Sequence, residues 1–173
     1  MKKVNNWLLA AGQVGLLAWS GATLAADKVY VANEGADTVS VLDAASLETL
    51  ASVRAGKAPH NVQVSPDGKL LWVTNNGEPA QTAACAHLEL AQGEQGAMAT
   101  AGAVWAIDTT SHAVVAKVPV GMHPAHVVVS RDGRFAYVTN TYANSVSVID
   151  VKNRKVVKTI SVGKAPNGIS MTP

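Results

Sequence analysis

Cysteine is almost absent from this chain. Its 173 residues include a single cysteine, Cys85, so no disulfide can form within the chain. A lone cysteine can instead pair with another molecule, hold a metal or stay a free thiol. Cys85 is therefore a residue whose position matters for function.

An excess of charge of either sign is also lacking. Lys2 and Lys3 are the only charged residues among the first 25, and the 12 basic residues beyond them balance 12 acidic ones. Because no basic cluster remains, the chain offers no surface suited to nucleic acid or to an anionic membrane. We therefore predict no nucleic-acid partner.

The signature motifs of common enzymes are missing as well. The sequence contains no Gly-x-Ser-x-Gly, no phosphate-binding loop and no dinucleotide-binding fingerprint. It also lacks Cys-x-x-Cys-His, so this chain does not attach a c-type haem covalently, whereas a non-covalent haem is compatible with the sequence. These absences favour a role without catalysis.

Only one long apolar run occurs, at residues 7–19. It follows a basic start and leads to the small residues Thr23, Leu24 and Ala25. That order is typical of a secretory signal, with cleavage expected after Ala25, whereas a membrane helix needs about 20 apolar residues. We predict a signal peptide at 1–25 and an exported protein at 26–173, periplasmic or secreted, without membrane insertion.

What the sequence has in abundance is an internal repeat. Three segments share one pattern, at Val29–Asn33, Leu71–Asn75 and Ala136–Asn140. Each is followed by a second run that ends in aspartate, at Asp43, Asp108 and Asp150. Each unit then reaches a Gly-x-x-Pro, at Gly56–Pro59, Gly121–Pro124 and Gly163–Pro166. A fixed period of this size indicates a stacked array of one supersecondary unit.

The spacing of the repeat is regular except for one insertion. Asn33 and Asn75 are 42 residues apart, as are Asp108 and Asp150, whereas Asn75 and Asn140 are 65 apart. The 23 additional residues must lie between Asn75 and Asp108, and we place them near 78–101. The repeats then cover about 28–56, 57–120 and 121–173.

Each unit contains four short runs rich in β-branched residues. In the third unit these are Phe135–Asn140, Ser145–Asp150, Lys155–Val162 and Asn167–Thr172. Runs of this length between turn residues are strands, and their short connections require antiparallel pairing. Four-stranded units at this period are the blades of a β-propeller. We therefore predict an all-β fold, a β-propeller of four-stranded antiparallel blades.

Three segments resemble the YVTN family of β-propeller repeats. They read Tyr-Val-Thr-Asn at 137–140, Asn-Ser-Val-Ser-Val-Ile-Asp at 144–150 and Pro-x-x-Val-x-Val-Ser-Pro-Asp-Gly at 59–68. The resemblance covers the chain after residue 25 except for the insertion, and it implies the propeller fold. Relatives include exported and surface-layer proteins and the d1-haem propellers of cytochrome nitrite reductases and their assembly factors. It implies no single activity, because one fold hosts many activities.

The number of units is smaller than a closed propeller needs. Closed rings have about 4–8 blades, and this sequence contains three units. After the leader, the chain begins on a strand that is second in its blade, and Asn167–Thr172 reads as a first strand that could complete that blade. We expect either a six-bladed ring made by two chains, a homodimer, or a partial ring from a longer propeller.

Strand parity predicts which polar residues share one end of the blades. In an antiparallel meander, the connection into the first strand and the one between strands two and three lie at the same end, and the turns at Asp67 and Asp132 lie at the other. First strands line the channel. The residues expected at its mouth are His60, Asn61, His123, His126 and Asn167.

The insertion is expected at the same mouth, because it joins strands two and three of its blade. It carries Cys85 and His87 and is rich in alanine, glycine and glutamine. That composition fits a short helix or disorder equally well. Four of the five histidines and the only cysteine are thus expected at one end.

Histidine and cysteine are the usual ligands of zinc, copper and haem iron. In addition, His60-Asn61-Val62 is similar to the Pro-His-Gly-Val segments of the nitrous oxide reductase propeller, a similarity that implies copper ligation by inner-strand histidines. The candidate ligands of a metal, copper or zinc, or of a non-covalent haem are His60, Cys85, His87, His123 and His126. Asn61 and Asn167 are candidate ligand contacts at the mouth. The alternative interpretation is that these histidines bond loop carbonyls.

Polar residues that recur in every unit are expected to serve the fold, because catalysis seldom needs one group per blade. We expect Asn33, Asn75 and Asn140, and likewise Asp43, Asp108 and Asp150, to bond turn backbone. Trp72 and Trp105 are expected in the core, and His112 in a solvated loop at the far end.

Two functions are consistent with these features. The first is an exported propeller that acts as a binding or scaffold module through the mouth face, with a protein partner or a second copy of itself. The alternative is a metal- or d1-haem-binding component of a periplasmic redox system of the denitrification type.

Overall fold

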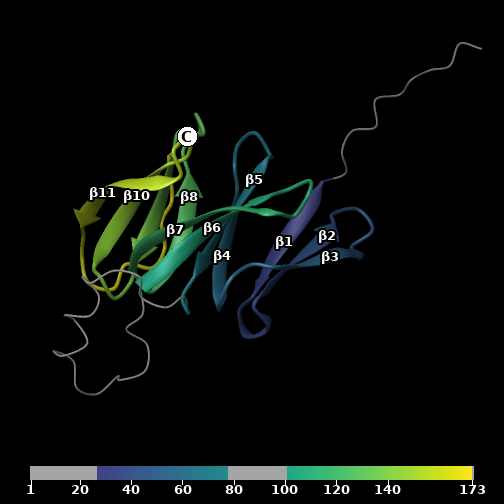
Figure 1. The fold of residues 1–173 in the computed structure, drawn as a ribbon, viewed down its shortest axis with the longest axis horizontal. Coiled ribbons are helices and arrows are strands. Elements are labelled where there is room, and N and C mark those ends of the chain that lie inside the picture. The colour runs from purple at the N-terminus through teal and green to yellow at the C-terminus, as the bar shows by residue number, and fades with distance from the viewer. Residues whose placement is uncertain (1–26, 78–100, 173) are drawn as a thin grey trace, which may run out of the picture.

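The computed structural model describes residues 27–77 and 101–172, and short strands make up most of it (Figure 1). The predicted leader and most of the predicted insertion, with Cys85 and His87, lie outside the described residues. In chain order the elements are β1 (Lys28–Asn33), η1 (Glu34–Ala36), β2 (Thr38–Asp43), β3 (Thr49–Arg54), β4 (Pro59–Val64), β5 (Leu70–Asn75), β6 (Ala101–Asp108), β7 (Val114–Met122), β8 (Pro124–Val129), β9 (Phe135–Asn140), β10 (Ser145–Asp150) and β11 (Lys155–Ser161). Among the described residues, no helix has the length and hydropathy needed to cross a bilayer.

The described strands form three antiparallel sheets that follow one another along the chain. Their strand orders are β1-β2-β3, β4-β5-β6-β7 and β8-β9-β10-β11, each a simple meander. Figure 1 shows the sheets in a row, with the first and third at opposite ends. The predicted all-β fold of antiparallel propeller blades is confirmed. The first sheet has three strands because β1 corresponds to the second strand of the other blades.

The core lies between consecutive blades and follows the alternation of side chains along each strand. Leu71 and Val73 of β5 pack in the cluster shared with the first sheet, whereas Trp72 packs in the cluster shared with the third. Trp72 is fully buried, as predicted. The same prediction for Trp105 was wrong. Its ring is half-buried beneath the ammonium of Lys117, which lies 3.9 Å from the ring centroid on the neighbouring strand.

Aspartates stabilise the turns that join the third strand of each unit to the fourth, as predicted. Asp43 Oδ1 accepts hydrogen bonds from the backbone N–H groups of Ala45 and Ser46, at 2.9 and 2.7 Å. Asp108 and Asp150 make equivalent bonds in their own turns. Because these bonds favour the ionised carboxylate, they hold the pKa of each of the three aspartates below its usual value.

The recurring asparagines act differently from the prediction. Asn33 Nδ2 donates to the hydroxyl of Ser40 at 2.8 Å, and Asn140 Nδ2 donates to Ser147 at 2.9 Å, so the partners lie on the neighbouring strand rather than in turn backbone. The side chain of Asn140 also leaves no room for a side chain at position 121. A Cβ at Gly121 would lie 2.6 Å from the Asn140 side chain, which explains why glycine stands there.

One threonine per blade connects that blade to the next. The first strand contains a bulge that takes one N–H out of the ladder, that of Asn61 in β4. Thr74 Oγ1 accepts this N–H at 2.9 Å and donates to the carbonyl of Ala125, in the next blade, at 2.8 Å. Thr139 repeats the arrangement with the N–H of His126 and the carbonyl of Asn167. Ala32 occupies the same place in the first sheet, which lacks the bond.

The expected strand at Asn167–Thr172 is not formed. Its residues form no strand. They lie against the third blade in the same way as the start of β8 lies against the second blade. The segment therefore does not complete the first blade within this chain. The physical reason is that a strand needs a hydrogen-bonding neighbour, and the strand it would pair with, β1, belongs to the blade at the other end of the row.

We expect Thr74→Val to destabilise the protein by about 1–3 kcal/mol, because the valine keeps the shape of the side chain but leaves the Asn61 N–H without an acceptor. Urea unfolding measures the change. The control is Thr159→Val at an exposed position of β11, where we expect a change within about 0.5 kcal/mol. Equal effects at the two sites would contradict the bridging role of Thr74.

Candidate functional site

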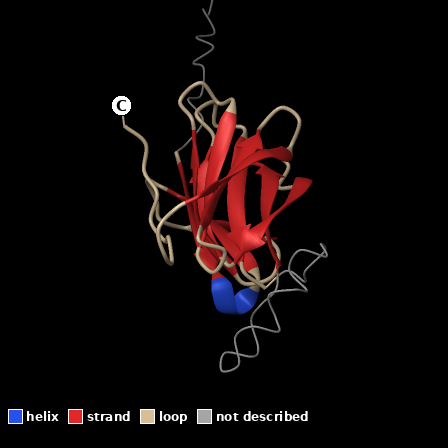
Figure 2. Ribbon diagram, turned by 90° about the vertical axis from the view of Figure 1, so that its left-hand side faces the viewer, coloured by secondary structure: helices blue, strands red, loops and turns tan. Residues whose placement is uncertain are grey.

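Three connections that differ between the blades meet at one end of the strands. They are η1 between β1 and β2, the turn at His123 between β7 and β8, and residues 141–144 between β9 and β10. Figure 2 shows η1, in blue, at this end. The opposite end carries the repeated turns of Asp67 and Asp132, each accepting a hydrogen bond from the hydroxyl of a neighbouring serine at 2.6 Å.

The structure brings together the three histidines that the sequence assigned to the mouth. The ring of His60 in β4 stacks against that of His126 in β8, with centroids 5.9 Å apart and an interplanar angle of 25°. The ring of His123 lies 6.5 Å from that of His60 and stacks on Tyr142 at 4.4 Å. We call the set Glu34, His60, His123, His126 and Tyr142 the mouth surface.

Glu34 adds the only acidic side chain to this surface among the described residues that contact the histidines. Its Oε2 lies 3.4 Å from Nδ1 of His60, and the two side chains are 56% and 33% exposed. Because both are open to water, the contact is weak and becomes an ion pair only when His60 is protonated. The mouth thus offers exposed imidazole nitrogens beside one carboxylate.

His123 occupies an unusual backbone conformation. Its φ is +54°, in the left-handed region, where histidine is commoner than most side chains. Partial burial lowers the pKa of His123 below its ordinary value, and the neighbouring His60 lowers it further. The neutral ring is therefore favoured, which leaves a nitrogen lone pair for a donor or a metal.

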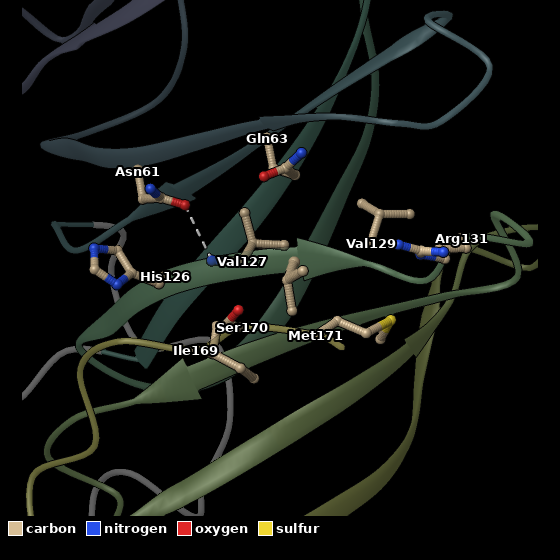
Figure 3. A pocket seen from close by; sticks show the side chains of 10 residues that line it. Asn61, Gln63, His126, Val127, Val129, Arg131, Ile169, Ser170 and Met171 are labelled. Carbon is tan, nitrogen blue, oxygen red and sulfur yellow. Dashed lines mark hydrogen bonds between the residues drawn. The ribbon is translucent and has the colours of Figure 1, made fainter. Parts of the chain in front are cut away.

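A groove continues from the mouth along the inner strands (Figure 3). It encloses about 480 Å³ between β4, β8 and the terminal segment, and we call it the channel groove. The lining residues are Asn61, Gln63, His126, Val127, Val128, Val129, Arg131, Ile169, Ser170 and Met171. Asn61 Oδ1 accepts the N–H of Val127 at 3.1 Å, so this candidate contact residue also joins two inner strands.

Sequence reasoning missed several residues of the site. Glu34 and Tyr142 lie in connections between second and third strands, so the parity argument that placed the insertion at the mouth would also have found them. Gln63 lies two residues after Asn61 on the channel side of β4, and strand alternation would have found it. Asn167 takes part through its carbonyl, which accepts the Thr139 hydroxyl at 2.7 Å.

His112 lies away from this site, as expected, in the turn between β6 and β7. It is half-buried rather than solvated. Its φ of +59° matches those of Leu47 and Arg154 at the equivalent turns.

The metal assignment stays a prediction. Within residues 27–77 and 101–172, no group of three or more histidine, cysteine, aspartate or glutamate side chains has an arrangement able to hold a metal ion. The other two candidate ligands, Cys85 and His87, lie outside the described residues. The ring of His60 stacks on that of His126 and is tilted by 46° to that of His123.

The repeats themselves show that the fold does not need these histidines. The place of His60 is taken by Ala125 in the next unit, and the place of His123 is taken by Ala58 and Ala165. Ala58 and Ala165 have the same left-handed φ, +49° and +48°, so the turn forms without an imidazole. The blade backbone therefore does not require a histidine at these positions.

Taken together, the stacked blades and the polar mouth define an open β-propeller array. The sequence model of the YNCE-like β-propeller family matches residues 78–172, and this chain belongs to that family. Among curated proteins, none matches it in sequence.

Three solved structures with similar architecture are larger than this chain. One is the hydrazine synthase of Kuenenia stuttgartiensis, with a TM-score of 0.63 and 21% identity over 80% of this chain. Another is the dihydro-haem d1 dehydrogenase NirN in complex with DHE, with a TM-score of 0.58 and 23% identity over 83% of this chain. A 6-phosphogluconolactonase-like protein of Bacteroides fragilis is a third (0.57, 20%, 78%). This chain spans 34%, 26% and 36% of their lengths, respectively. At these identities the likeness shows the fold alone.

We expect the stability of the protein to fall as the pH drops below about 6.5, in part through His123. Because the folded state lowers the pKa of His123, the unfolded chain takes up the proton first. The contribution of His123 to stability is therefore fully present above the unfolded pKa, and it is lost as the pH falls through the lower pKa of the folded state.

His123→Asn tests this, since asparagine also tolerates a left-handed φ. Urea unfolding at about pH 7.5 and about pH 5.5 should show a smaller loss for His123→Asn than for the parent. The matched control is Leu47→Asn, at φ +62° in a far-end turn, which removes no titratable group and should keep the pH-dependent loss of the parent. A parent-like loss in His123→Asn would contradict the assignment.

Proposed function

We propose that this chain is an exported β-propeller module of the YVTN type that binds a partner through its mouth surface without catalysis. The observation that carries the proposal is the convergence of His60, His123 and Tyr142 at one end. His60 lies in β4, whereas His123 and Tyr142 come from two different connections. Other repeats hold Ala125 or Asn167 at the position of His60, and alanine at that of His123. Side chains that the fold does not require, gathered in one place, are the usual mark of a binding site.

The chemistry of the mouth surface fits a polar partner that presents flat groups. Its rings are stacked in pairs and partly open to water, so their faces and nitrogen atoms can contact a second surface at low entropic cost. Aromatic side chains are enriched in the cores of protein interfaces. The described part of the chain carries no cluster of basic residues here, which agrees with a protein rather than a nucleic acid.

The alternative function is a metal- or d1-haem-binding component of a periplasmic redox system. The three adjacent imidazoles favour it, because neutral imidazole binds copper, zinc and haem iron. One structure of similar fold is described as a dihydro-haem d1 dehydrogenase in complex with DHE, which is consistent with a haem ligand in propellers of this kind. The residues that would complete such a site are Cys85 and His87.

The binding proposal predicts that the mouth surface controls affinity. We expect a triple variant with alanine at His60, His123 and His126 to bind a partner isolated from exported proteins of the native host at least about tenfold more weakly, a loss of about 1.4 kcal/mol. Isothermal titration with the purified partner measures the change. The control His112→Ala removes the remaining described histidine, in a far-end turn, and should bind like the parent. Undiminished binding by the triple variant would exclude the mouth surface.

The metal alternative predicts a different result. Protein from the native host should then contain near-stoichiometric copper or zinc by elemental analysis, or show a haem absorption spectrum. Cys85→Ser with His87→Ala should lower that content while the melting temperature of the metal-free protein stays within a few degrees of the parent, about the range of a surface change. Deletion of about 78–101 should do the same, because loop length costs little stability. The alternative would be excluded if protein from the native host contained neither metal nor haem.

A further inference from the structure

The mouth surface contains one carboxylate that no lysine or arginine balances. Oε2 of Glu34 lies 3.4 Å from Nδ1 of His60, a side chain that carries a charge only when it is protonated. The neighbouring acid, Asp37, has a cation of its own, because Nζ of Lys57 lies 2.9 Å from Asp37 Oδ2. Within the part of the chain that the structure describes, Glu34 therefore has no permanently charged partner.

Aromatic rings lie next to this carboxylate. The ring of His60 is followed by that of His123 at 6.5 Å, and Tyr142, which is 45% exposed, stacks on His123 at 4.4 Å. The charge of Glu34 acts on His123 as well, because it opposes the lowering of the His123 pKa by burial and by His60. A carboxylate and a row of partly exposed rings thus form one continuous surface.

Hydrogen bonds hold both ends of this surface in place. The short helix η1 carries Glu34 and ends at Asp37, whose Oδ1 accepts an N–H from the turn before β4 at 2.9 Å. At the other end, the hydroxyl of Thr141 donates to the carbonyl of Pro166 at 2.9 Å, next to Tyr142 in the same connection. Because both connections are already fixed, a partner side chain can bind here at low entropic cost.

The acid and the exposed tyrosine come from different blades and are not copies of one repeat position. Glu34 belongs to the connection between β1 and β2, and Tyr142 to that between β9 and β10. Thr141 stands at the repeat position of Glu34, and Gly35 at that of Tyr142. Each connection therefore supplies a group that the other lacks, and the blade structure requires neither.

We propose that the partner of the mouth surface is a protein that presents an arginine side chain to Glu34 and to the rings beside it. The inference rests on the proposed function, because it names the chemistry of the partner bound there. A guanidinium is planar, forms two hydrogen bonds to one carboxylate and stacks on aromatic faces, whereas a lysine ammonium is a strongly hydrated point charge. An acidic partner would instead bring like charge toward Glu34, which costs energy.

A library of random peptides tests the chemistry of the partner without knowledge of its identity. Peptides are selected on the whole protein at about pH 7.5, and those that bind equally well to the triple variant with alanine at His60, His123 and His126 are discarded. Arginine should be enriched at least about threefold over its frequency in the library, the weight of one exposed ion pair. Mouth-dependent peptides without this enrichment would overturn the arginine inference and leave the proposed function standing. The absence of any mouth-dependent peptide would contradict both.

Changes on both sides of the contact then test the pairing with Glu34. In the tightest such peptide, citrulline in place of arginine keeps the flat group without its charge and should weaken binding about tenfold. Glu34→Gln should weaken the arginine peptide about fivefold and change the citrulline peptide less than about twofold. The matched control is Lys164→Gln, at the repeat position of Lys57, which removes a charge of opposite sign and should bind the arginine peptide no more weakly than the parent.

Fluorescence anisotropy of the labelled peptides measures these affinities, and circular dichroism checks that each variant is folded. Equal affinities of the arginine and citrulline peptides would overturn the inference. So would an unchanged affinity in Glu34→Gln, or a loss in Lys164→Gln as large as that in Glu34→Gln.

Discussion

The junction between the second and third blades depends on a buried threonine hydroxyl. The bulge in an inner strand removes one N–H from the sheet, and Thr74 accepts it while donating to the inner strand of the third blade. Thr139 repeats the arrangement with the terminal segment at Asn167. A single hydroxyl thereby satisfies two backbone groups that would otherwise be buried unpaired. Because donor and acceptor belong to different blades, the bond fixes the position of each inner strand relative to the next. The first sheet, with Ala32 in this place, lacks the threonine bond and meets the second through apolar packing and through bonds such as that from the Ala58 N–H to Asp37 Oδ1.

The residues that hold a blade together are different from those of the mouth surface, so the mouth surface can vary while the blade stays the same. Thr139, Asn140 and Asp150 bond to strand and turn partners, so each blade is fixed by its own residues and those of its neighbour. In the mouth connections Asp37 and Asn144 accept the N–H groups of Ala58 and Ala165, whereas the positions of His60 and His123 hold alanine in other repeats. Histidine or alanine can stand at one repeat position with nearly the same backbone φ, as His123 shows beside Ala58. A rigid scaffold with variable connections is the arrangement that places function on loops.

The same modularity leaves both ends of the row unfinished. A blade has two unlike faces, and a linear row of three always ends on one of each. Val29 at one end and Ile160 at the other are apolar because the repeat makes them so, and they are exposed because the described chain supplies no further blade. Repeat architectures usually cover such ends with atypical, polar capping units.

The sequence by itself determined the strands, their antiparallel order and the end at which His60, His123 and His126 lie, because these follow from a period of 42 residues and from strand parity. It also determined the aspartate turns, whose bonds reach only two or three residues along the chain. The tertiary structure alone decided what depends on contacts between distant segments. Asn140 bonds Ser147 because β9 and β10 pair, and His123 stacks on Tyr142 because two connections from different hairpins meet. Residues 167–172 have the sequence of a strand but no strand beside them, and an extended segment becomes a strand only where a neighbour offers its hydrogen bonds.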